Sequence, residues 1–81
     1  MLKLPTPEYP VGRSGSVVVE VRVDRNGNVT SVRGGMRGST TNDSELIMAA
    51  ERAARLAKFD VDPNATSIQT GTITYVFRLQ D

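Results

Sequence analysis

The chain has 81 residues, 38% hydrophobic and 23% charged, with ten Lys and Arg against nine Asp and Glu. It is long enough for one domain but not for two, and its near-neutral charge argues against nucleic acid as a partner. It contains no Cys and no His, which excludes thiolate and imidazole catalysis and removes the commonest zinc ligands.

The N-terminal segment is rich in proline. Three of the four prolines in the chain are Pro5, Pro7 and Pro10, and a proline keeps the residue before it out of the helical region. We therefore predict an extended lead-in over residues 1–14 and a single folded domain over residues 15–81. No run approaches the roughly 18 apolar residues of a membrane-spanning helix, and the start lacks a signal-peptide core.

The next segment has the pattern of a β-hairpin. Between Gly15 and Asp24 every second residue is valine, from Val17 to Val23, which predicts a strand with one buried face. The sequence Asp-Arg-Asn-Gly-Asn follows at 24–28, and Asn-Gly between alternating segments is typical of a hairpin turn. A second strand is expected over residues 28–33.

A loop and then a helix follow the hairpin. Residues 34–41 include three glycines and show no periodicity, so they are expected to form a loop or an irregular strand end. From Asp43 the hydrophobic spacing becomes helical, with Asp43 or Asn42 as the N-cap, over about sixteen residues to Lys58. The predicted buried stripe is mostly alanine and comprises Leu46, Ile47, Ala50, Ala53, Ala54 and Ala57.

Alternation returns near the C-terminus, after Phe59 and a polar connection. A last strand is predicted over Thr72–Leu79, with Ile73, Tyr75, Phe77 and Leu79 inward and Thr72, Thr74, Val76 and Arg78 outward. The predicted class is α+β: a three-stranded antiparallel sheet with one main helix packed on one face, in the order β-β-α-β. We expect the last strand to lie at an edge, beside the first.

The sequence gives no sign of catalysis. The acidic residues fall in a turn, on the helix surface and in a loop, where solvated carboxylates are expected rather than a catalytic pair. The glycine-rich stretch at 34–40 lacks the Gly-Lys-Ser/Thr core of a phosphate-binding loop. We therefore predict no catalytic residue, no metal ligand and no cofactor.

The outward residues of the last strand are unusual for a sheet edge. Thr72, Thr74 and Val76 are uncharged, and Arg78 is the only charged residue among them. Unprotected edge strands offer unpaired N–H and C=O groups to another strand. The residues alone leave two interpretations open: a tolerated edge on a small domain, or a docking edge for an extended peptide that adds a strand.

Several motifs occur in a familiar order. They are Pro7-Glu8-Tyr9-Pro10, Gly15-Ser16-Val17, Val23-Asp24-Arg25-Asn26-Gly27-Asn28-Val29, Leu46 with Ala49-Ala50, Phe59, and Ile73-Thr74-Tyr75-Val76-Phe77-Arg78-Leu79. Together they make the chain, from Pro5 to Leu79, resemble the C-terminal domain of the TonB family of energy transducers.

This resemblance implies a function and a set of partners. Such a domain is the periplasmic part of an inner-membrane-anchored protein, and it couples the proton motive force to nutrient uptake. It binds the TonB box peptide and the plug domain of outer-membrane receptors, while regions missing from this chain contact the proton-channel motor proteins. By position, the partner-binding residues would be Thr6, Pro7, Glu8, Tyr9, Thr72, Thr74, Val76 and Arg78. No cofactor is implied.

Departures from the family pattern keep an alternative open. Only residues 11–14 separate Tyr-Pro from Gly-x-Val, where most members have a longer segment, and Ala57 and Val61 replace an aromatic residue and a proline. These differences bear on the receptor contacts of the N-terminal segment more than on the fold. The alternative is a TonB-like interaction or dimerisation module appended to another membrane protein, such as a sensor or a peptidase, with homodimers formed through the edge strand. In either case we expect the chain to be one domain of a longer protein.

Overall fold

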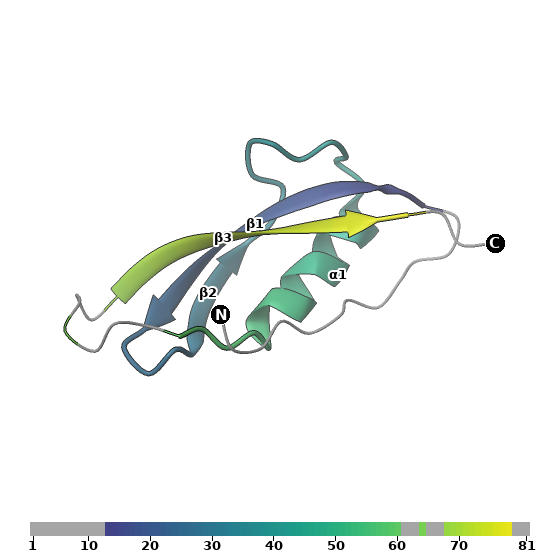
Figure 1. The fold of residues 1–81 in the computed structure, drawn as a ribbon. Coiled ribbons are helices and arrows are strands. Elements are labelled where there is room, and N and C mark those ends of the chain that lie inside the picture. Colours follow the sequence, from purple (N-terminus) through teal and green to yellow (C-terminus); the bar gives the residue numbers. More distant parts are fainter. Residues whose placement is uncertain (1–12, 61–63, 65–67, 79–81) are drawn as a thin grey trace.

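The structure is a computed structural model, and it describes residues 13–60, residue 64 and residues 68–78. Its elements are β1 (Gly15–Asp24), β2 (Val29–Arg33), α1 (Ser44–Arg55) and β3 (Ile68–Phe77). The strands form one antiparallel sheet in the order β2-β1-β3, and α1 packs across one face (Figure 1). The predicted α+β class, the β-β-α-β order and the place of the last strand beside the first are all confirmed.

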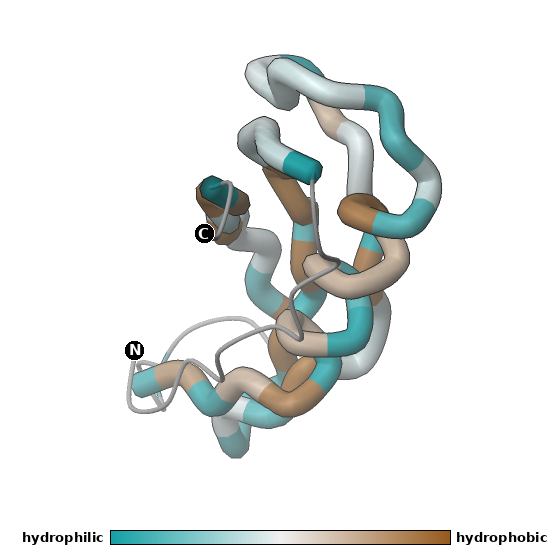
Figure 2. The backbone as a smooth tube through the Cα atoms, turned by 90° about the vertical axis from the view of Figure 1, so that its right-hand side faces the viewer, coloured by the Kyte–Doolittle hydropathy of each residue, from teal (hydrophilic) through white to brown (hydrophobic). Residues whose placement is uncertain are grey.

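The hydrophobic core lies between the sheet and the helix. Viewed along the sheet, the chain alternates between apolar and polar residues (Figure 2), as expected for strands with one buried face. The core consists of Val17, Val19, Val21, Val23, Leu46, Ala49, Ala50, Ala53, Ala54, Ala57, Ile73, Tyr75 and Phe77. The alanines on α1 allow the helix to lie close to the valines of β1.

The hairpin turn is held by side-chain and backbone hydrogen bonds. The Asp24 carboxylate accepts from the N–H groups of Asn26 at 2.9 Å and Asn28 at 3.0 Å. Gly27 has a φ of +86°, which residues with a Cβ rarely adopt. The N–H of Phe59 donates to the Gly27 carbonyl at 2.9 Å, so the chain after the helix is attached to the tip of the hairpin.

The helix begins where the sequence predicts and ends earlier. Asp43 is the N-cap, and its side chain accepts from the N–H of Glu45 at 3.0 Å. The helix ends at Arg55 rather than near Lys58. Lys58 instead forms an antiparallel bridge with Asn28, which requires extended backbone and so ends the helix.

The buried stripe of α1 differs slightly from the predicted one. Ala49 is buried although the prediction omitted it, and Ile47 is only partly buried although the prediction included it. Ala57 is buried as predicted, but it lies just after the helix. The helix is therefore rotated slightly about its axis relative to the prediction, so that Ala49 and not Ile47 faces the core.

The last strand needs the largest correction. It begins at Ile68, four residues before the predicted Thr72, and ends at Phe77. The reason is its partner: each of the ten residues of β1 pairs with one residue of β3, from Asp24 with Ile68 to Gly15 with Phe77. Arg78 follows the strand rather than belonging to it, and Leu79 lies outside the described residues.

The loop over residues 34–42 lies along the part of β1 that β2 leaves uncovered. The N–H groups of Met36 and Thr40 donate to the carbonyls of Val18 at 3.1 Å and Ser16 at 2.9 Å. In return, the hydroxyls of Ser39 and Thr40 accept from the N–H groups of Val18 at 2.9 Å and Ser16 at 2.8 Å. Most of the segment projects beyond the sheet (Figure 1), and it takes the place of a longer second strand.

Candidate functional site

One edge of the sheet, along β3, is not paired with any other described strand. The N–H and C=O groups of Ser16 and Val18 point toward the loop. Because these groups alternate in direction along an antiparallel strand, the odd-numbered residues of β1 bond to β3. The register pairs these residues with the odd-numbered residues of β3. The even-numbered residues of β3 therefore direct their N–H and C=O groups to the free edge.

Three consecutive edge positions are threonines. Thr70, Thr72 and Thr74 have no hydrogen bond to another described residue through their outward backbone groups. Their side chains are exposed and lie on the face opposite α1. We call Thr70, Thr72 and Thr74 the threonine edge. It offers up to three N–H donors and three C=O acceptors to an extended segment.

The opposite edge of the sheet is better protected. The strand β2 has only five residues, and the pairing with β1 is interrupted by a bulge next to Arg22 and Val23. Beyond β2, the N–H of Gly34 donates to the Glu51 carboxylate at 2.8 Å. Short strands, bulges and charges discourage edge pairing. The ten residues of β3 pair with β1 without a bulge, so the threonine edge is the more regular and less protected of the two edges.

The sequence-predicted partner-binding residues are only partly brought together. Thr72, Thr74 and Val76 share the exposed face of β3, with Val76 53% exposed, and Arg78 is exposed just past the strand. Thr6, Pro7, Glu8 and Tyr9 lie outside the described residues. The prediction missed Thr70, because Gly71 was taken to precede the strand. Residues 68–71 show no alternation of apolar and polar residues, so only the pairing with β1 reveals this part of the strand.

Charged residues lie beside the threonine edge on the outer face. In the register, Arg22 of β1 is next to Thr70, Glu20 is next to Thr72 and Val18 is next to Thr74. Arg33 of β2 pairs with Glu20 on the far side. A shallow hollow of about 260 Å³ lies here, lined by Glu20, Arg22, Ser31, Val32 and Arg33. Among the described residues, neither Glu20 nor Arg22 forms an ion pair.

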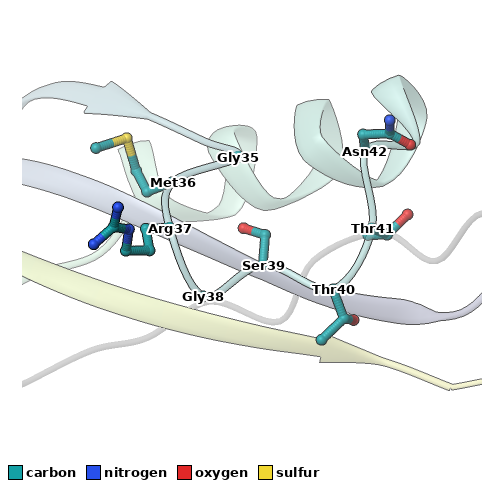
Figure 3. Close-up of a pocket in the computed structure, with 8 residues that line it drawn as sticks. All are labelled: Gly35, Met36, Arg37, Gly38, Ser39, Thr40, Thr41 and Asn42. Atoms are coloured by element: carbon teal, nitrogen blue, oxygen red, sulfur yellow. The ribbon is translucent and has the colours of Figure 1, made fainter.

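A second hollow lies over the loop, with a volume of about 550 Å³ and residues 35–42 around it. Met36 and Arg37 project at one end of this loop, and Asn42 lies at the other, near the start of α1 (Figure 3). The Ser39 and Thr40 hydroxyls already accept hydrogen bonds from β1, and Arg37 is the only charged residue of the lining. The two hydroxyls therefore attach the loop to the sheet. The lining of the hollow presents no set of groups that could perform catalysis.

The N-terminal end of α1 holds the start of β1 in place. Arg13 forms ion pairs with Asp43, at 3.1 Å between Nε and Oδ2, and with Glu45. The two acidic side chains also suit the positive end of the helix dipole. These contacts fix where the chain enters the domain.

Two buried polar atoms lie on the helix side of β3. The Tyr75 hydroxyl and Gln69 Nε2 are buried and have no hydrogen-bond partner among the described residues, and burial raises the pKa of the Tyr75 hydroxyl. Both side chains point away from the threonine edge's exposed face, because they are odd-numbered. These two polar groups therefore affect the stability of the fold and do not belong to the threonine edge.

The described residues contain neither a cluster of metal ligands nor a membrane-spanning helix. No group of three or more acidic side chains that could hold a metal ion occurs in this part of the chain. Within the same ranges, no helix has the length and apolar character needed to cross a membrane.

Comparison with known proteins identifies one family. The family model described as Gram-negative bacterial TonB protein C-terminal matches residues 5–79. No curated protein and no solved structure matches the chain.

Proposed function

This chain belongs to the TonB C-terminal domain family, and on that premise we propose that the threonine edge binds the TonB box of outer-membrane receptors by strand addition. Domains of this family are periplasmic interaction domains of Gram-negative bacteria. The observation that supports the proposal is the row of outward backbone groups on Thr70, Thr72 and Thr74, which have no partner among the described residues.

The geometry favours an extended peptide over other ligands. A strand that adds to β3 lies about 4.8 Å away and gains regular main-chain hydrogen bonds without a preformed pocket. Such binding needs little sequence identity in the peptide, because the bonds use the backbone. Specificity then depends on the side chains that flank the edge.

Receptor binding gives the domain its place in energy coupling. The domain transmits the proton motive force of the inner membrane to the bound receptor, as the periplasmic domain of an anchored protein whose other regions contact the proton-channel motor proteins. Val76, near the end of β3, and Arg78, just past it, flank the threonine edge and also contact the box peptide. In the N-terminal segment, the residues that contact the receptor plug are Thr6, Pro7, Glu8 and Tyr9. Binding of this kind requires no cofactor in the domain, which acts by binding a partner rather than by catalysis.

NMR shift mapping tests the proposal. Receptor N-terminal peptides are added to the ¹⁵N-labelled chain, and the largest amide shifts are expected along Ile68–Phe77, with a second group near Tyr9. The variant Thr74→Pro removes an outward N–H without removing a bond to β1, so we expect it to weaken binding at least tenfold, through one lost hydrogen bond and the bulk of the ring.

The matched control is Thr74→Val, which keeps the N–H and the shape of the side chain. Its affinity is expected to stay within about threefold of the parent, because one exposed hydroxyl contributes little. Peptide binding that persists in a folded Thr74→Pro protein would contradict the proposal. Sedimentation over a range of concentrations tests the alternative use of this edge, in which a second copy of the chain pairs with it.

A further inference from the structure

The outer face of the sheet places opposite charges at fixed positions behind the docking edge. Counting from the threonine edge inward, Arg22 lies behind Thr70 and Glu20 lies behind Thr72, while Val18 lies behind Thr74. The side chain of Arg22 is exposed and that of Glu20 is half-buried. Neither side chain forms an ion pair with another described residue.

A docked strand is close enough to reach these charges. Neighbouring strands lie about 4.8 Å apart, so a strand on the edge of β3 lies about 9.6 Å from β1 and about 14 Å from β2. Side chains leave a sheet roughly perpendicular to it, which limits sideways reach to about 5 Å for arginine and about 3 Å for glutamate. With about 3 Å for the hydrogen bond itself, the total of about 11 Å spans the distance to β1 but not to β2.

The residue between the docked strand and β1 does not block this contact. Threonine is short, and the residues of β3 that lie beside Arg22, Glu20 and Val18 are all threonine. A long charged side chain on the docked strand can therefore pass over Thr70 or Thr72 and pair with β1. Arg33, one strand further away on β2, is beyond reach.

We propose that the outer face selects the charge sequence of the docked segment, preferring an acidic residue beside Thr70, a basic residue two positions away beside Thr72, and an uncharged residue beside Thr74. The acidic side chain pairs with Arg22 and the basic one with Glu20. This inference rests on the proposed function, since it assumes that an extended segment pairs with β3. It adds a specificity that backbone pairing alone cannot provide.

Two peptides of the same composition test the inference. Both are extended segments rich in threonine and valine. At the centre of each, two residues on the outer face of the sheet are charged, in the order Glu-x-Lys in one peptide and Lys-x-Glu in the other. The parent chain is expected to bind one of them about three- to tenfold more tightly, as for two partly solvated charge pairs. Which order is preferred also reports whether the segment docks parallel or antiparallel to β3. The preference should shrink as salt is raised, because these charges are screened.

A charge-swapped protein gives the decisive comparison. The double variant Glu20→Arg with Arg22→Glu keeps the net charge and is expected to invert the peptide preference. The control Arg33→Gln should keep the same order of preference between the two peptides, because Arg33 cannot reach the docked strand and can only change the strength of the Glu20 contact from the opposite side. Equal binding of both peptides, or an unchanged preference in the swapped protein, would overturn the inference while leaving strand addition intact. If neither peptide shifts the amides of β3, strand addition itself fails and the charge rule fails with it.

Discussion

Replacing Gly27 with alanine, at the tip of the hairpin, should destabilise the domain more than replacing Gly71 with alanine inside β3. A Cβ at Gly27 would lie 2.1 Å from the Phe59 carbonyl oxygen, and the residue has a φ of +86°. The positive φ costs about 1–2 kcal/mol for a residue with a Cβ. The clash also displaces Phe59, whose N–H bonds to the Gly27 carbonyl at 2.9 Å, at a cost of about 1 kcal/mol more.

The expected total for Gly27→Ala is about 2–3 kcal/mol, out of the roughly 4–12 kcal/mol by which a folded chain of this size is stable. Urea unfolding followed by circular dichroism measures the change. With a slope of about 1 kcal/mol per molar for so small a domain, the midpoint should fall by about 2 M or more.

The matched control is Gly71→Ala. Gly71 lies inside β3, and a Cβ there would meet only a Val21 methyl at 3.9 Å, an ordinary contact. We expect this variant to lie within about 0.5 kcal/mol of the parent, or to be slightly more stable, because alanine restricts the unfolded chain. If the two variants lose the same stability, or Gly27→Ala loses less than about 0.5 kcal/mol, then the attachment of Phe59 to the hairpin tip does not stabilise the fold as described.

Three further variants test separate parts of the structure. Asp43→Ala removes the N-cap of α1 and a partner of Arg13, and should cost about 1 kcal/mol of unfolding free energy in urea titrations; a change indistinguishable from zero would argue against the cap. Leu46→Ala leaves a cavity under a fully buried side chain and should cost about 2–5 kcal/mol, measured the same way; a smaller loss would mean that α1 can close onto the sheet. Burial raises the pKa of Tyr75 above its ordinary 10.0, so the unfolded chain loses this proton first, and the stability that is complete below about pH 10 should fall as the pH rises toward the native pKa. Tyr75→Phe should reduce that fall in thermal unfolding from pH 8 to 11, and an unchanged pH profile would refute the assignment.

The sequence was sufficient to predict the hairpin and the helix start, because both depend on local chemistry. Asp24 at the turn and Asp43 at the cap accept hydrogen bonds from residues within four positions in the chain. The end of the helix depends instead on contacts between Lys58 and Asn28, thirty residues apart. Local periodicity does not report such contacts, so the predicted helix runs three residues too far.

The candidate site was predicted in part for a similar reason. Alternation at Thr72, Thr74 and Val76 identified the exposed face of the last strand, but the true start of that strand is set by the length of β1 and not by its own residues. Thr70 can therefore be assigned to the site only from its pairing with Arg22 in the structure. The charges behind the edge were equally hidden, since a strand register cannot be read from either strand alone.

The pairing of β1 with β3 also governs how the chain reaches its fold. The paired residues are 44 positions apart at Asp24 with Ile68 and 62 apart at Gly15 with Phe77, whereas the hairpin partners are near neighbours in sequence. Because closing long loops costs entropy before any contact forms, distant pairs slow folding. During synthesis, the second edge of β1 therefore stays uncovered until β3 has been made. A ribosome stalled before Phe77 would hold a hairpin and a helix with a valine-rich central strand open on one side, which makes this nascent state the point of greatest exposure to aggregation.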